Sequence, residues 1–222
     1  MPSLFSKPAA ARTLLVLGFI SLGYVLSAVV NEFLRGPAPG GMPVVMDTVA
    51  TVLPEPMNVP AFTLHDHNGK IFTNENLKNK WTFVFFGYTH CPDICPTTLV
   101  TLDQTDKILR ELKIKPMPEV VFVSVDPERD TTEHLASYVA YYNPDFTAVT
   151  GPVDQLHALT RPIGIMFQRS PDTNTADDYQ IDHSVTVLLI DPQARLRALN
   201  SPPHNAEAIA HDYKEIISVF AD

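Results

Sequence analysis

Cysteine is nearly absent from this chain, with Cys91 and Cys95 as the only two among 222 residues. Two cysteines allow at most one disulfide, which exported domains often use as a structural staple. However, a bridge between residues four positions apart closes so short a loop that it constrains the unfolded chain little. The pair is therefore predicted to carry chemistry rather than to stabilise the fold.

Basic residues are also scarce: the chain has 16 Lys and Arg against 25 Asp and Glu, and its formal net charge is −9. The first 31 residues contain Lys7 and Arg12 but no acid, so the remainder has 14 basic and 25 acidic residues and a net charge of −11. Such a surface argues against nucleic acid or anionic lipid as a ligand. It fits a basic protein partner, and equally a charge that only keeps the domain soluble.

Charge of either sign is missing from Thr13 to Val30, a run of 18 residues rich in Leu, Val, Ile and Phe. As a helix the run would extend about 27 Å, close to the thickness of the hydrocarbon core of a bilayer. We therefore expect residues 13–31 to form one transmembrane anchor. The alternative is a cleaved signal peptide, but cleavage after Ala28 would leave the bulky Leu26 at the position three before the cut.

Charges around the apolar run predict its orientation. Lys7 and Arg12 precede the run, and the first acid is Glu32. Because basic residues stay on the cytoplasmic side, residues 1–12 are expected in the cytoplasm and the rest of the chain across the membrane. The short N-terminus favours a bacterial inner membrane, with the soluble domain in the periplasm, and leaves a mitochondrial inner membrane as the alternative.

Proline and glycine are concentrated after the anchor. Residues 32–56 are expected to form a Pro/Gly-rich tether, and residues 57–222 a globular domain. In that domain Asn68-Gly69 predicts a hairpin turn, and residues 171–178 are expected to form an exposed loop.

Continuous apolar runs typical of buried strands alternate with helical patterns along the domain. Strands are predicted at 81–86, 120–125, 146–149 and 185–190, with 196–199 as an antiparallel neighbour of the last. Helices are predicted from Pro96 to about Leu112, from Asp130 to Tyr142, from about Pro152, and from Asn205 to about Phe220. This alternation indicates an α/β fold, a central mixed sheet with helices on both faces.

The two thiols follow one predicted strand and precede a helix, which is how thioredoxin-like folds present reactive sulfur. Their spacing is Cys-x3-Cys rather than the Cys-x2-Cys of the disulfide oxidoreductases. Pro96 suits the first position of the helix, because its missing N–H is not needed there. Cys95 is then expected to cap the helix, with Cys91 in the preceding turn, where the helix dipole stabilises a thiolate.

His183 is a candidate third donor, because it immediately precedes the predicted strand Val185–Ile190 and so lies at a strand edge. Two thiolates and one imidazole make a three-coordinate set that suits Cu(I) and also holds Cu(II). A structural zinc site would require a fourth protein ligand. His90 is a candidate for that position, but its neighbour Cys91 is expected to point elsewhere from a tight turn. The donor set therefore favours copper.

Three motifs follow one another in order: Gly-Tyr-Thr-His-Cys-Pro-Asp-Ile-Cys-Pro at 87–96, Ser-Val-Asp-Pro-Glu-Arg-Asp-Thr at 124–131, and Asp-His-Ser at 182–184. Together they closely resemble the Sco/SenC family of membrane-anchored copper proteins, over about residues 57–221.

The resemblance implies a thioredoxin-like domain that binds one copper ion through Cys91, Cys95 and His183. It also implies a metallochaperone that helps to assemble the dinuclear copper centre, CuA, of cytochrome c oxidase subunit II. Gln193-Ala194 departs from the family, where a glycine-bearing turn is expected. That departure lies away from the ligands and concerns partner contacts rather than metal binding.

An enzyme is the alternative to a chaperone: a thiol–disulfide reductase that keeps the copper-ligand cysteines of the target subunit reduced. Both functions require Cys91 and Cys95, which we expect to form a redox-active disulfide when copper is absent, whereas only copper binding requires His183. Thioredoxin-type oxidoreductases have a proline before the strand that faces the site, and residues 182–186 lack one. Metal binding is therefore favoured. Another periplasmic copper chaperone and a thioredoxin-like reductant are further expected partners.

Two acidic residues are candidates to support the copper ligands without binding the ion. Asp182 precedes His183 and is placed to orient its ring, although a solvated loop acid fits equally. Asp126, with Arg129 and Asp130, follows a predicted strand and is a candidate for tuning the site. For Asp130 a structural role is sufficient, because it has the spacing of a capping box.

Overall fold

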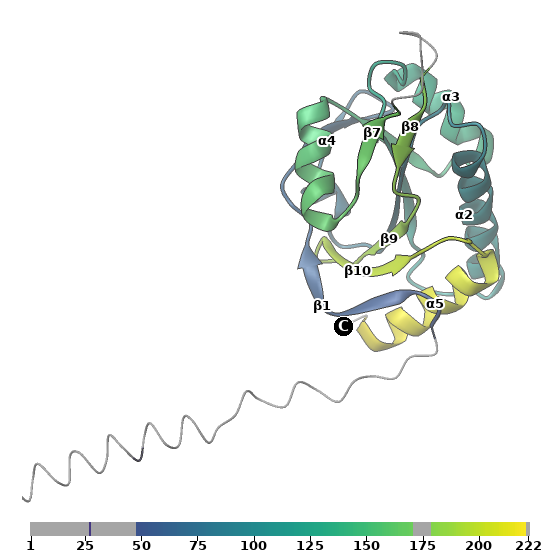
Figure 1. Ribbon diagram of the computed structural model, residues 1–222. Helices are drawn as coiled ribbons and strands as arrows, with labels where there is room; N and C mark the ends of the chain where they lie inside the picture. Colours follow the sequence, from purple (N-terminus) through teal and green to yellow (C-terminus); the bar gives the residue numbers. More distant parts are fainter. Residues whose placement is uncertain (1–26, 28–47, 171–178, 221–222) are drawn as a thin grey trace, which may run out of the picture. The chain divides into compact units, whose positions relative to one another are not determined.

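The computed structural model describes residues 48–170 and 179–220, together with Ser27, and within these residues an eight-stranded mixed sheet forms the centre of the fold (Figure 1). Its strand order is β1-β10-β9-β4-β5-β6-β2-β3. The β4–β5 and β5–β6 pairs are parallel, and the other neighbouring pairs are antiparallel. The strands are β1 Thr51–Asn58, β2 Thr63–Asp66, β3 Ile71–Thr73, β4 Thr82–Gly87, β5 Glu119–Ser124, β6 Thr147–Thr150, β9 Val187–Ile190 and β10 Arg195–Asn200.

Several sequence predictions fall outside the described residues: the cytoplasmic segment 1–12, the anchor 13–31 except Ser27, most of the tether, and the loop 171–178. Among the residues that are described, no helix combines the length and apolar character needed to cross a membrane. Met46–Asp222 is a compact unit by itself.

Strand β1 lies mostly within residues 32–56, which the Pro and Gly content predicts to be a tether. Instead, Thr51 pairs with Leu199 and Met57 with Leu196 of β10, with a register shift between the two pairs. The prolines of β1 are tolerated because it is an edge strand, where a missing N–H breaks no essential ladder bond. The sheet therefore begins before residue 57.

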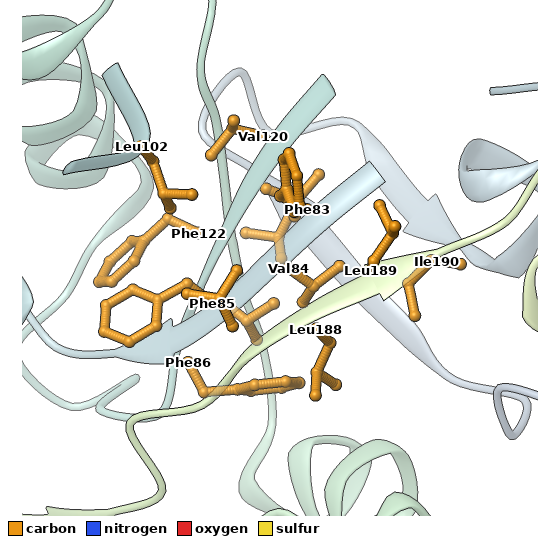
Figure 2. Packing of buried hydrophobic residues seen from close by; sticks show 14 of the residues in the cluster. Phe83, Val84, Phe85, Phe86, Leu102, Val120, Phe122, Leu188, Leu189 and Ile190 are labelled. Atoms are coloured by element: carbon orange, nitrogen blue, oxygen red, sulfur yellow. The ribbon is translucent and has the colours of Figure 1, made fainter. Parts of the chain in front are cut away.

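Strand β4 is the buried centre of the sheet, as its apolar sequence predicts, since all six of its residues are buried. Because side chains alternate along a strand, β4 contributes buried side chains to both faces of the sheet. Phe83 packs on Tyr213, with ring centres 5.6 Å apart. On the opposite face, Val84 and Phe86 line a small apolar cavity together with Leu159. Figure 2 shows part of this core.

Helices cover both faces of the sheet, as predicted (Figure 1). Four α-helices are described, α2 Ile94–Glu111, α3 Thr132–Tyr142, α4 Val153–Thr160 and α5 Ala206–Phe220, with short 3-10 helices η1 Asn74–Leu77 and η2 Arg161–Ile163. Tyr213 of α5 packs on Phe83 of the sheet. Tyr138 of α3 packs on Phe122. Leu159 of α4 lies on the other face.

The predicted Asn68-Gly69 hairpin is confirmed by the pairing of β2 with β3. Asp66 Oδ1 holds the turn by accepting from the N–H groups of Asn68 and Lys70, both at 2.8 Å. Gly69 has a φ of +76°, which an L side chain rarely adopts.

The start of α3 differs from the prediction, because Asp130 does not cap it. The cap is Thr131, whose side chain accepts from the N–H of His134. Asp130 is instead fully buried. The cap predicted for the last helix is confirmed: Asn205 Oδ1 accepts from the N–H of Ala208 at 2.8 Å.

The segment around His183 also differs from the prediction. The buried strand begins at Val187 rather than Val185, and His183 ends a separate strand, β8 (Ile181–His183). Strand β8 pairs with β7 (Phe167–Arg169) in a two-stranded sheet, where His183 lies opposite Phe167. A short hairpin outside the main sheet therefore carries the histidine.

The turn at Gln193-Ala194 forms without the expected glycine. Ala194 has a φ of 59°, in the left-handed region that favours glycine. The carboxylate of Asp191 stabilises the turn, because its Oδ1 accepts from the N–H groups of Gln193 and Arg195, both at 3.0 Å.

Candidate metal centre

The three predicted donors, Cys91, Cys95 and His183, come together at one point of the fold. Their ligand atoms lie within 4.8 Å of one another, and Cys95 Sγ is 3.4 Å from His183 Nε2. Both cysteines are free thiols. Cys95 is fully buried, whereas Cys91 and His183 are half-buried, so the cluster opens toward solvent on one side.

The start of α2 sets the positions of the two sulfurs. The helix begins at Ile94 after an N-cap at Asp93, so Cys95 lies within the first turn, and the prediction that it caps the helix is wrong. The turn before the helix is held by a bond from the N–H of Cys91 to the carbonyl of Tyr88, 3.3 Å. N–H groups of a first helical turn have no partner within the helix. They are therefore available to a thiolate.

The two thiols differ strongly in acidity. The S–H of Cys95 donates to the sulfur of Cys91 and is the main cause that lowers the pKa of Cys91 to about 3. The backbone N–H groups of Asp93 and Cys95 add to this effect. The pKa of Cys95 is raised, because its proton is shared with Cys91 and because the group is buried. A metal bound by both sulfurs must displace that second proton.

This difference predicts selective alkylation. At pH 5, iodoacetamide is expected to modify Cys91, which is already a thiolate, while the buried thiol of Cys95 remains unmodified. In Cys95→Ala the main donor is lost, so the pKa of Cys91 rises and its labelling at pH 5 slows. Peptide mass spectrometry measures both rates, and equal labelling of the two cysteines would contradict the assignment.

The imidazole of His183 is oriented by its own neighbour in the chain. Its Nδ1 lies 3.1 Å from the carbonyl oxygen of Ser184. Because a carbonyl oxygen only accepts, Nδ1 carries the proton and the lone pair of Nε2 faces Cys95. Asp182, the residue expected to orient the ring, is exposed on β8. The backbone carbonyl thus provides the orientation expected from Asp182.

Tyr88 also contacts the histidine, and sequence reasoning missed it. Its ring meets that of His183 edge-on, with centres 5.8 Å apart, and its hydroxyl donates to Gln180 Oε1 at 2.7 Å. Phe85 packs on the same imidazole at 6.2 Å. The available signal was an aromatic residue between a buried strand and the two thiols.

Asp126 acts on the segment before β8 rather than on the ligands. Its Oδ2 accepts from Arg129 Nε at 2.6 Å, and its Oδ1 accepts from the hydroxyl of Tyr179. The ring of Tyr179 lies between the guanidinium groups of Arg129 and Arg169, at 3.6 and 3.5 Å from the ring centre. This stack holds the start of the strand that leads to His183.

Gly87, at the end of β4, leaves room for the buried sulfur. A Cβ at this position would lie 2.7 Å from Cys95 Sγ and 2.9 Å from the ring of Phe122. Both distances are shorter than ordinary contacts, so one of these groups would have to move. Glycine is required here by close approach rather than by backbone conformation.

We therefore expect Gly87→Ala to displace the Cys95 sulfur and to weaken Cu(I) binding about ten- to a hundredfold, as other changes that misplace a ligand do. Competition with a chromogenic Cu(I) chelator measures the affinity. Gly151→Ala is the matched control, because its Cβ would lie 2.8 Å from Leu64 Cδ2, away from the donors. Equal losses in the two variants would argue against a local effect.

Comparison with known proteins places residues 52–218 in the family model described as SCO1/SenC. The chain is similar to copper-bound ScoI of Arabidopsis thaliana, with a TM-score of 0.67 and 30% identity, over 73% of this chain and 99% of that one. For copper-bound ScoI of Bradyrhizobium japonicum, the TM-score is 0.63 and the identity 31%, over 71% and 98%. The mitochondrial SCO2 homolog of Bos taurus is 33% identical over 72% of this chain, which spans 59% of that protein.

Proposed function

Since the chain belongs to the SCO1/SenC family, we propose that it is a copper metallochaperone that binds one ion through Cys91, Cys95 and His183. The observation that carries the proposal is the convergence of their donor atoms within 4.8 Å. The two solved ScoI relatives are described as copper-bound.

The donor set fits copper chemically. Two sulfurs and one imidazole nitrogen match the preference of Cu(I) for soft, low-coordinate sites, and the same set also accepts Cu(II). His183 already directs an unprotonated Nε2 toward the sulfurs. Cys91 is half-exposed, so a partner protein can reach one ligand while Cys95 and His183 still hold the ion. Such access is what ligand-by-ligand transfer requires.

The receiving partner that we propose is cytochrome c oxidase subunit II, whose CuA centre the ion would enter. This assignment is supported by the family resemblance of the three motifs. We also propose that residues 13–31 anchor the chain in a bacterial inner membrane, with residues 1–12 in the cytoplasm and the domain in the periplasm. The net charge of −11 outside the first 31 residues favours a basic docking surface on the partner.

Copper stoichiometry tests the binding site. The reduced chain is expected to bind one Cu(I) in competition with a chromogenic chelator, and the double variant Cys91→Ser, Cys95→Ser is expected to lose this binding, because both soft donors are removed. Ser218→Ala, a change at an exposed residue of α5, serves as the control. Full-strength Cu(I) binding by the double variant would overturn the proposal.

A thiol–disulfide reductase is the second candidate, and the difference between the two thiols favours it. An accessible thiolate at Cys91 beside a buried thiol at Cys95 is the arrangement of an attacking and a resolving cysteine. In this function the Cys91 thiolate attacks a target disulfide, and Cys95 then displaces the target as a thiol, so the pair ends as a disulfide. The same disulfide is expected to block copper loading, because copper requires both thiolates.

A further inference from the structure

A second group of side chains that could hold a metal ion includes His90, which directly precedes Cys91 in the sequence. His90, Asp126 and Asp130 place their donor atoms within 4.8 Å of one another. The ring of His134, from the first turn of α3, lies 6.1 Å from that of His90. His90 belongs to this group and not to the group of two thiols and one imidazole, so it does not complete the first site.

Two imidazoles converge here on the hydroxyl of Thr89. His90 Nδ1 lies 3.1 Å and His134 Nε2 lies 3.0 Å from Thr89 Oγ1. Imidazole binds such metals at about 2.0–2.1 Å, so both rings would have to turn from Thr89 Oγ1 toward one shared ion. Both histidines are exposed, so their rings can make this movement without disturbing the core. Each ring then carries its proton on the outer nitrogen, where water accepts it.

A buried negative charge lies beneath the two rings. Asp130 is fully buried, and its Oδ1 is 3.8 Å from His90 Nδ1. Thr89 connects the carboxylate to the rings, since its hydroxyl donates to the same Oδ1 at 2.5 Å. The nearby Asp126 is paired with Arg129, whereas the basic side chain within ion-pair distance of Asp130 in the described residues is His90. Its negative charge attracts a cation that is bound by the two rings.

We propose that His90 and His134 form a second metal site, which takes a divalent ion of borderline softness and prefers Cu(II). Imidazole nitrogens suit Cu(II), Ni(II) and Zn(II), and the affinity of such donors is highest for Cu(II) among the divalent first-row metals. Cu(I), in contrast, is matched by the thiolates of the first site. The protein then holds two copper ions, of which only the one at the first site has thiolate ligands.

The test removes the thiols first, so that the outcome does not depend on the proposed chaperone function. In the full chain with Cys91→Ser and Cys95→Ser, titration with Cu(II) in the presence of glycine as a competitor is expected to show one saturable site. Electron paramagnetic resonance of this ion is expected to show hyperfine coupling to two imidazole nitrogens. Adding His134→Ala is expected to weaken binding about tenfold or more, because one of two protein ligands is lost.

Two further variants distinguish metal ligation from a structural effect. His134→Gln retains a hydrogen-bonding group for Thr89 but offers a poor copper ligand, and it is expected to lose binding as His134→Ala does. His65→Ala removes an exposed histidine on β2, and its affinity is expected to stay unchanged. The proposal is overturned if the thiol-free chain has no saturable Cu(II) site, or if His134→Ala binds Cu(II) as tightly as its parent.

Discussion

His183→Ala is expected to weaken copper binding more than a hundredfold, since losses of about 10- to 100-fold already follow from changes outside the ligand set. The substitution removes Nε2, which faces Cys95 Sγ at 3.4 Å, and leaves two sulfurs that cannot complete the coordination. Exchange with a model disulfide is expected to change much less. The main cause of the low pKa of Cys91 is the S–H of Cys95, which the variant retains.

The same variant separates the two proposed functions in cells. Under limiting copper, a strain that carries His183→Ala at the wild-type protein level is expected to assemble little CuA centre, as judged by its optical spectrum. Cys91→Ser, which disables both functions, provides the lower limit. A normal CuA centre in the His183→Ala strain would reject the chaperone and favour the reductase, because thiol exchange does not require the imidazole.

Asp130→Ala is expected to lower the free energy of unfolding by about 3–5 kcal/mol, because it strands one buried and two part-buried donors at once. The carboxylate accepts from the N–H of Thr89 at 3.0 Å, from its hydroxyl, and from the hydroxyl of Ser124 at 2.5 Å. These bonds tie the loop that leads into the thiols to the end of β5. For a domain of this size the melting temperature is expected to fall by about 10 °C.

Thermal unfolding followed by circular dichroism measures this loss. Asp154→Ala, at an exposed acid in the first turn of α4, is the control and is expected to change stability little. Asp130→Asn retains one acceptor oxygen without the charge, so its stability is expected to lie between those of the wild type and the alanine variant. A drop below about 1 kcal/mol for Asp130→Ala would show that the network is not important for stability.

The reassignment of Asp130 shows where sequence reasoning reaches its limit. The spacing from Asp130 to Glu133 has the pattern of a capping box, and a cap on the next residue, Thr131, satisfies nearly the same pattern. Only burial distinguishes Asp130 from Thr131 as the cap. Asp130 is buried because the loop that leads into the thiols packs against the end of β5. The start of α2 was misplaced by two residues for a similar reason. Pro96 is tolerated anywhere in the first turn, so it does not define the first helical residue.

Consecutive residues were sufficient for the strand–thiol–helix unit and for the buried strands β4, β5 and β9, and the motifs made Cys91, Cys95 and His183 the candidate donors. Apolar runs and motif spacing are local properties, and a chain shows them before it folds. The tertiary structure alone decided how the donors differ. Cys95 and His183 are separated by 88 positions, and Thr89 and His134 by 45. Contacts over such separations depend on strand order and helix packing. Desolvation and hydrogen bonding therefore act on the donors only after the fold has brought these groups together.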